Sequence, residues 1–179
     1  MRIMIGVSGS DSGDSSLTPS TLKVAEEVGY YVAKKGAVLV SGGRGGVMEA
    51  AARGAKKAQG LTIGIMPESA GEANSFIDVA IPTYMGYARN YLLVRSVDAL
   101  IAIAGRWGTL NEISLALNIG KPTIIIKGSG GWADILAEEG LLERFETRPR
   151  VASSAREAVE LAIKVSQRCG VPDSRARMS

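Results

Sequence analysis

The chain of 179 residues is long enough for one domain with a sizeable core, and 46% apolar with 22% charged residues indicates a globular rather than a disordered protein. A net charge of +3 is small and indicates a solvated surface more than a surface built for a polyanion. With no histidine and only Cys169 as a thiol, an intrachain disulfide, a histidine-dependent nucleophile and the usual histidine-based zinc sites are excluded.

The sequence shows no sign of a membrane segment or a signal peptide. No apolar stretch reaches the ~18 residues needed to cross a membrane. The short segment 1–9 continues directly into a polar loop, which does not fit a signal peptide. We therefore expect a cytoplasmic protein without a membrane partner.

The first half of the chain alternates between short apolar segments and helical patterns. Residues 2–7 are a predicted strand, and a Gly/Ser-rich loop follows at 8–17. Thr18 and Pro19 have the sequence of a helix start, and Gly36 is placed to end that helix. The elements expected next are a strand at 37–40, a helix from 46 to about 59, and strands at 61–66 and 76–81.

The second half continues the alternation. Ser154 and Glu157 have the spacing of a capping box before the last helix. We expect residues 1–168 to form a single domain and 169–179 to be a flexible tail. The predicted elements are helices at 87–96, 109–118, 132–139 and around 164, and strands at 98–104, 122–127 and 150–152.

Short apolar strands separated by helices are typical of a parallel sheet covered on both faces. We therefore predict an α/β fold: a doubly wound, Rossmann-like parallel sheet of about six or seven strands, with helices on both faces. In such a sheet the ligand lies beyond the carboxyl ends of the strands. The residues that follow each strand are therefore the candidate site.

Two common nucleotide-binding motifs are missing after the first two strands. The first strand is followed by SGSDSG, which is not G-x-G-x-x-G, and the second ends without the acidic residue that holds an NAD ribose. No G-x-x-x-x-G-K-[ST] stretch occurs either. The sequence thus disfavours an NAD dehydrogenase and a P-loop NTPase.

The loop after the second predicted strand has the sequence SGGRGGVMEAA. Its glycines let backbone N–H groups approach an anion at a helix start, and Arg44 adds a cation. A tight turn with close packing is the alternative explanation. We favour phosphate binding by this loop together with the polar loop after the first strand, through Gly9, Ser10, Ser41, Gly42, Gly43, Arg44, Gly45 and Gly46.

The stretch AGRWGTLNEI follows the fifth predicted strand. Gly105 and Gly108 bracket a tight turn, and Trp107 is available to contact a base or a neighbouring side chain. Thr109 and Glu112 have capping-box spacing, so from spacing alone we favour Glu112 as a helix cap. The alternative is a carboxylate that faces the ligand, where it holds ribose hydroxyls or assists glycosidic cleavage.

The stretches SGGRGGVMEAA, MGYARN and GRWGTLNEI, at this spacing, resemble the LOG-like Rossmann family, formerly labelled "possible lysine decarboxylase". That family is marked by GG-x-x-G-h-M, where h is apolar, and by P-G-G-x-G-T-x-x-E. The resemblance covers about residues 1–127. It is closest to an uncharacterised prokaryotic subgroup related to DprA/Smf and to the molybdenum-cofactor carrier proteins. It implies a nucleotide-binding fold that assembles as a dimer or higher homo-oligomer.

The resemblance also implies roles for individual residues. Arg89 and Glu112 match the catalytic residues of enzymes that hydrolyse nucleoside 5′-monophosphates to free base and ribose 5-phosphate. The residues that match the family's ligand loops are Gly42, Gly43, Gly46, Met48, Gly108 and Thr109. The chain departs from the family pattern at Ala104, which replaces a proline, at Arg106, which replaces a glycine, and at Asn90 and Asn111.

Two functions are left open by the sequence. In the first, a phosphoribohydrolase, Arg44 or Arg106 helps to hold the 5′-phosphate. Arg89 orients the ribose phosphate or the base, and Glu112 holds the ribose hydroxyls and favours the oxocarbenium-like transition state. In the second, a non-catalytic carrier binds an AMP-like nucleotide or the molybdenum cofactor, with Gly105, Arg106 and Trp107 at the site. Neither function requires a resident cofactor or a metal. Nucleic acid is not an expected partner, because aromatic residues make up only 5% and do not alternate with basic ones.

Overall fold

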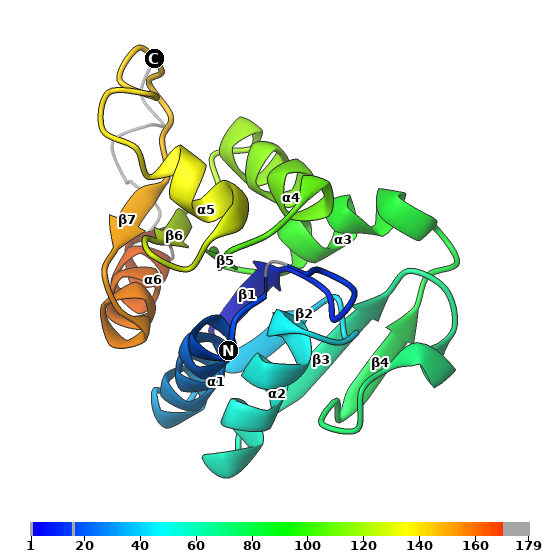
Figure 1. Ribbon diagram of the computed structural model, residues 1–179. Helices are drawn as coiled ribbons and strands as arrows, with labels where there is room; N and C mark the ends of the chain where they lie inside the picture. Colours follow the sequence, from blue (N-terminus) through cyan, green and yellow to red (C-terminus); the bar gives the residue numbers. More distant parts are fainter. Residues whose placement is uncertain (1, 16, 170–179) are drawn as a thin grey trace, which may run out of the picture.

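The structure, a computed structural model, describes residues 2–15 and 17–169. In this part of the chain, seven strands form one sheet in the order β4-β3-β2-β1-β5-β6-β7, and every neighbouring pair is parallel (Figure 1). The strands are β1 (Met4–Gly9), β2 (Val38–Ser41), β3 (Thr62–Met66), β4 (Val79–Pro82), β5 (Ala99–Ile103), β6 (Thr123–Ile126) and β7 (Arg150–Ala152).

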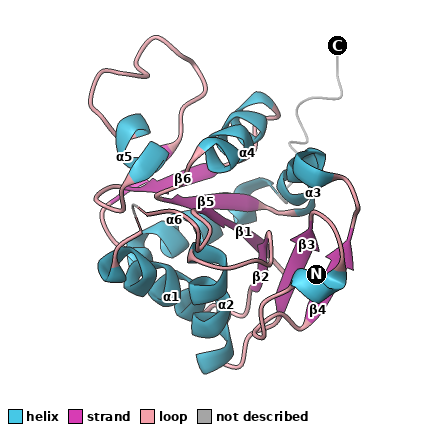
Figure 2. Ribbon diagram, turned by 45° about the vertical axis from the view of Figure 1, so that its right-hand side comes forward, coloured by secondary structure: helices cyan, strands magenta, loops and turns pink. Residues whose placement is uncertain are grey.

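Helices cover both faces of the sheet, so the predicted doubly wound α/β fold is confirmed. Figure 2 shows α1 and α2 together below the sheet and α4 and α5 above it. Besides two short 3₁₀ helices, η1 (Ala70–Glu72) and η2 (Gly86–Ala88), the structure has α1 (Pro19–Lys34), α2 (Val47–Lys57), α3 (Arg89–Ser96), α4 (Trp107–Asn118), α5 (Gly131–Leu136) and α6 (Ala155–Cys169).

The central strands are apolar because both of their faces are buried. All five residues of β5 (ALIAI) and all four of β6 (TIII) are buried. One core cluster joins the sheet to α1, α2 and α6, and two others join it to α3, α4 and α5. A strand that is covered on both sides cannot alternate polar and apolar residues, which explains the continuous apolar runs in the sequence.

The chain reverses its direction of travel across the sheet beside β1. It moves outward from β1 through β2 and β3 to β4, then returns to place β5 on the other side of β1. The loops after β1 and β5 therefore diverge at the carboxyl edge of the sheet. This is the switch point at which doubly wound sheets bind their ligands.

The capping box predicted at Thr109 and Glu112 is wrong. The helix α4 begins two residues earlier, at Trp107, and the Leu110 N–H donates to the Arg106 carbonyl at 3.0 Å. Gly105 has a φ of +100° and lets the chain turn into the helix at once, which places Thr109 inside the first turn. Glu112 therefore points its carboxylate elsewhere.

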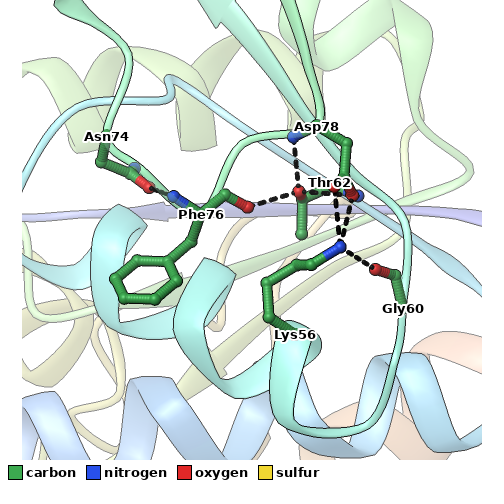
Figure 3. Close-up of polar contacts among 6 residues, drawn as sticks. All are labelled: Lys56, Gly60, Thr62, Asn74, Phe76 and Asp78. Atoms are coloured by element: carbon green, nitrogen blue, oxygen red, sulfur yellow. Dashed lines mark hydrogen bonds and ion pairs between the residues drawn. The ribbon is translucent and has the colours of Figure 1, made fainter.

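The fourth strand also begins later than predicted, at Val79. The Asn74 side chain accepts a hydrogen bond from the Phe76 N–H at 3.0 Å, which holds this stretch in a turn (Figure 3). Asp78 then accepts from Lys56 Nζ at 2.7 Å and from the Thr62 N–H at 2.9 Å. Although burial raises the pKa of Asp78, these bonds hold it below its ordinary value.

The C-terminal helix begins close to the predicted position. The Ser154 hydroxyl accepts from the Glu157 N–H at 3.2 Å, as a cap should, while the Glu157 carboxylate accepts from the Ser153 N–H at 2.8 Å. Most of the predicted tail, from 170 onward, lies outside the described residues. In the described part, no helix is long and apolar enough to cross a membrane.

Candidate functional site

A cleft of about 560 Å³ lies at the carboxyl ends of β1 and β5. A second hollow of about 610 Å³ adjoins it, and the two share Asp11, Ser12, Arg44, Tyr87 and Arg89. Each is within the size range of small-molecule sites. The structure thus brings together around one opening eleven of the residues predicted from the sequence: Gly9, Ser10, Arg44, Gly45, Met48, Arg89, Arg106, Trp107, Gly108, Thr109 and Glu112.

The other predicted residues pack behind this opening. A side chain on Gly42 would collide with the Arg89 guanidinium and the Met48 sulfur, and one on Gly43 would collide with Met66. Gly46, with a φ of +63°, approaches the backbone after β1 and begins α2. For these glycines, close packing explains the sequence. Similarly, the Ser41 hydroxyl accepts from the Gly43 N–H at 3.1 Å, and Gly105 packs against Thr109.

Three buried side chains meet at the base of the cleft, and we call Ser8, Arg89 and Glu112 its inner wall. Arg89 and Glu112 line the cleft, and Ser8 is bonded to Glu112 without lining it. The three residues come from β1, α3 and α4 and are 1%, 9% and 6% exposed. Arg89 Nη1 donates to Glu112 Oε1 at 3.0 Å, and the Ser8 hydroxyl donates to Glu112 Oε2. Both oxygens of the carboxylate are therefore engaged by residues of the protein.

Burial dominates the electrostatics of Glu112. It raises the pKa of the carboxyl above its ordinary value, because the charged form loses its hydration. The charge of Arg89 and the hydrogen bonds from Ser8 and Arg89 act in the opposite direction. The inner wall is thus a buried ion pair that depends on all three residues.

Arg89 retains a donor that no described residue uses. Its Nε is buried and has no hydrogen-bond partner in the described part of the chain. Buried donors in folded proteins are almost always paired, often with water or a ligand. Because Arg89 lines the cleft as well, this buried N–H lies next to the space that a ligand would occupy.

The mouth of the cleft, a name we use for Tyr87, Arg106 and Trp107, is exposed. Tyr87 and Trp107 are 83% and 70% accessible to solvent. Arg106 precedes α4, whose first internal hydrogen bond comes from Leu110, so the N–H groups of the first turn are left without helical partners. Because this turn lines the cleft, its N–H groups and Arg106 favour an anion there.

Arg44 lies in the same opening but is partly neutralised. Its Nε is 3.2 Å from Asp11 Oδ2, and both side chains are partly exposed. Asp11 also accepts from the Ser12 N–H at 2.7 Å. Arg44 is therefore a weaker anion-binding group than the sequence indicated.

The loop between β5 and α4 is braced from three sides. The Ser10 hydroxyl accepts from the Gly105 N–H at 3.0 Å, and the Ser129 hydroxyl accepts from the Ala104 N–H at 2.8 Å. The Gly105 carbonyl accepts from the Trp132 N–H at 3.0 Å. Ala104, with a φ of +52°, is kept in a left-handed conformation by these bonds.

Sequence reasoning did not predict Tyr87 or Ser129 as site residues, and it included Ser8 and Asp11 only as members of the polar loop after the first strand. A polar residue at the end of an apolar strand was the available signal for Ser8. For metal binding, the residues 2–15 and 17–169 contain no group of three or more acidic, histidine or cysteine side chains that could hold an ion.

Comparison with known proteins places this arrangement in a family. The model of the SLOG cluster4 family matches residues 2–161. An uncharacterised protein of Archaeoglobus fulgidus is 44% identical over 135 residues, which cover 72% of this chain and 87% of that protein.

Three solved structures extend the comparison. The molybdenum cofactor binding protein of Rippkaea orientalis is 39% identical, with a TM-score of 0.82, over 92% of this chain and 98% of that one. The molybdenum cofactor carrier protein of Chlamydomonas reinhardtii is 31% identical, with a TM-score of 0.79 and the same shares. DNA processing protein A of Helicobacter pylori, 19% identical over 90% of this chain and 80% of that one with a TM-score of 0.68, shares the fold. The predicted resemblance to LOG-like and DprA-like Rossmann proteins is confirmed, and the chain belongs to the SLOG cluster4 family.

Proposed function

We propose that this protein binds and carries a phosphorylated small molecule of the molybdenum-cofactor type, without hydrolysing it. The observation that carries this proposal is the inner wall. Both oxygens of Glu112 are bonded to Ser8 and Arg89, and the side chain is 6% exposed. The carboxylate that the resemblance makes catalytic therefore has a structural role in this chain.

A phosphoribohydrolase needs a carboxylate that reaches the ribose or the attacking water. To do so in this chain, Glu112 would have to leave Arg89, which is 9% exposed and would then be a buried charge without its partner. Removing one member of a buried pair costs about 3–5 kcal/mol. Binding needs no such change, because the free donors at the opening already suit an anion.

The hydrogen-bond donors available to the ligand lie at two depths in the cleft. Arg106 and the first turn of α4 suit a phosphate at the mouth, and the unpartnered Nε of Arg89 suits an acceptor further in. The molybdenum cofactor is a phosphate ester that contains a pterin. The likeness to two solved proteins whose names state that they bind or carry this cofactor supports the proposal.

The second candidate is a nucleoside 5′-monophosphate phosphoribohydrolase. One observation favours it: Arg89 and Glu112 both line the cleft, and burial raises the pKa of Glu112. A carboxyl group with a raised pKa is suited to proton transfer near neutral pH. This function requires the Glu112 side chain to exchange a bond to the protein for a bond to the substrate.

A loading experiment tests the proposal. The purified protein is mixed with molybdenum cofactor released from a molybdoenzyme, passed over a desalting column and assayed for molybdenum and for pterin. We expect both to remain with the protein, and an Arg106→Glu variant to retain at least tenfold less. Arg148→Glu, which reverses an exposed arginine in the segment between α5 and β7, is the matched control.

A parallel assay separates the two candidates. The same protein is incubated with AMP and with an N6-substituted AMP, and free base is measured. Retention of the cofactor without release of base supports a carrier. Release of base that Glu112→Gln abolishes would instead establish the hydrolase, and retention equal to that of an unrelated protein would refute the carrier.

A further inference from the structure

Two large aromatic side chains are left exposed where the cleft opens. Tyr87 belongs to η2 and Trp107 is the first residue of α4, and both line the cleft. They border the same short stretch of backbone, because a side chain on Gly108 would meet the Tyr87 ring at 3.9 Å. Exposed aromatic surface at a concave site is typical of a surface that binds.

Trp107 is held in place by Trp132. The two ring centroids are 5.2 Å apart with an angle of 53° between the planes. Trp132 is itself anchored, since its N–H donates to the Gly105 carbonyl at 3.0 Å. The next residue, Ala133, donates to the Ala104 carbonyl at 3.0 Å. The Trp107 ring is therefore held against a residue that is fixed to the loop before α4. A ligand that stacks on this ring causes little further loss of conformational entropy in the Trp107 side chain.

We propose that Trp107, supported by Trp132, is the stacking platform for the ligand's ring, with Tyr87 bordering the same space. This inference rests on the proposed function and names the ligand class more closely: a phosphate ester of a flat, conjugated heterocycle, such as a pterin or a purine. Aromatic stacking accepts any such ring, because every one of them has a π-face.

The position of Trp107 in the sequence couples the two parts of the ligand. Arg106 precedes it, and the free N–H groups of the first turn of α4 begin with its own. A ring stacked on Trp107 therefore carries its phosphate ester near the positive end of the helix. Ring recognition and phosphate recognition are thus provided by consecutive residues of one turn.

The test compares probes that share the phosphate ester and differ in the ring. Isothermal titration calorimetry is carried out with neopterin 3′-phosphate, AMP and ribose 5-phosphate. We expect Trp107→Ala to raise the Kd of the better ring-bearing probe about tenfold, as alanine does at other base-stacking aromatics. The Kd of ribose 5-phosphate should stay within twofold. Whichever ring-bearing probe binds more tightly identifies the ring as pterin or purine.

Three further variants test this interpretation. Trp107→Phe, which keeps an aromatic face, should retain most of the affinity, and Tyr91→Ala, which removes another exposed aromatic from α3, should change none of the three values. The chain has only two tryptophans, so Trp132→Phe leaves Trp107 as the single indole emitter. Its fluorescence should respond to the ring-bearing probes and not to ribose 5-phosphate.

The failures of the two proposals are distinguishable. An equal loss of affinity for all three probes in Trp107→Ala would overturn the platform and leave the proposed function standing. The same conclusion follows if ribose 5-phosphate binds the unaltered protein as tightly as the ring-bearing probes do. If the unaltered protein binds none of the three probes but retains the cofactor in the loading experiment, the platform is overturned and the proposed function stands. If it also retains no cofactor, both proposals fail.

Discussion

The inner wall and the mouth of the cleft are built in opposite ways. In the inner wall, Ser8, Arg89 and Glu112 are buried and bonded to one another across three elements. At the mouth, Tyr87 and Trp107 are mostly exposed, and the Trp107 ring packs against the Trp132 ring. A substitution in the inner wall should therefore lower the free energy of unfolding, and a substitution at the mouth should weaken the affinity for the ligand.

The strongest test of this contrast is Glu112→Ala. The substitution leaves Arg89 buried without its partner, so we expect the free energy of unfolding to fall by about 3–5 kcal/mol. Urea denaturation at pH 7 measures the loss. Glu68→Ala, which removes an exposed glutamate from the adjoining hollow, should change stability by no more than about 0.5 kcal/mol. A loss below 1 kcal/mol for Glu112→Ala would show that water already reaches the pair.

The pH dependence of stability tests the same wall more finely. Because burial raises the pKa of Glu112, the folded state holds this proton more tightly than the unfolded state does. That contribution to stability is fully present below the ordinary value of 4.5 and is lost as the pH rises through the raised pKa. This contribution to the free energy of unfolding is about 1.4 kcal/mol for each pH unit by which folding raises the pKa of Glu112.

Glu112→Gln provides the matched reference, because the amide keeps the shape of the carboxyl group and does not titrate. The stability of the unaltered protein minus that of the variant should decrease from pH 4 to pH 8. The measurement is a series of urea denaturation curves across that range. A difference that increases with pH would mean that Arg89 and Ser8 outweigh burial and that the pKa of Glu112 is lowered.

A polar cluster far from the cleft provides a reference for both regions. Asp78 accepts hydrogen bonds from Lys56 and Thr62 beside the sheet edge (Figure 3). Asp78→Asn should cost about 1 kcal/mol at pH 7, since it removes the charge that pairs with Lys56. Its pKa is lowered, so this contribution is present above 3.8 and is lost as the pH falls below that value.

For Asp78→Asn, the loss is measured by denaturation at pH 7 and again at pH 3. Affinity for ribose 5-phosphate should be unchanged, in contrast to variants of the mouth. A change in that affinity would mean that a substitution at the edge strand alters ligand binding in the cleft. Affinity would then not depend on the mouth of the cleft alone.

The sequence predicts the fold well because the relevant signals are local. The apolar run ALIAI predicts a strand from its own residues alone. In the same way, Thr18 before Pro19 predicts the start of α1, and the glycine after α1 predicts its end. The parallel sheet then follows from the alternation of elements. The start of α4 was missed because the φ of +100° at Gly105 and the anchoring of its loop cannot be seen in the spacing of Thr109 and Glu112.

The sequence predicts many of the residues of the site but not the contacts between them. Motif matches identified Arg89 and Glu112, but the partner that fixes Glu112, Ser8, lies 104 residues away in the chain. Likewise, the sequence predicts Trp107 as a site residue, but its contact with Trp132 forms only in the folded structure, between the segments that follow β5 and β6. Local patterns give the positions of a site's residues, whereas the hydrogen bonds and packing of each residue depend on contacts between segments that are distant in the chain.

The smallest expected effect lies between the two regions, at Asp11. Its carboxylate is 3.2 Å from Arg44 Nε, and both side chains are partly exposed, so the pair contributes at most about 1 kcal/mol to stability. Asp11→Asn keeps an oxygen for the Ser12 N–H and removes the charge that competes with the ligand for Arg44. We expect the Kd of ribose 5-phosphate to fall about two- to fivefold while stability changes little.

The gain in affinity for Asp11→Asn should shrink as salt is added, because it comes from a solvent-exposed charge. Titration calorimetry at about 50 mM and 300 mM salt measures it, with Glu72→Gln, another acidic residue of the adjoining hollow, as the control. A weaker affinity in Asp11→Asn would mean that the carboxylate contacts the ligand directly, as an acceptor for a ribose or pterin hydrogen-bond donor. Asp11 would then hold the ligand directly, unlike the buried Glu112, and Arg44 would serve to position the Asp11 carboxylate.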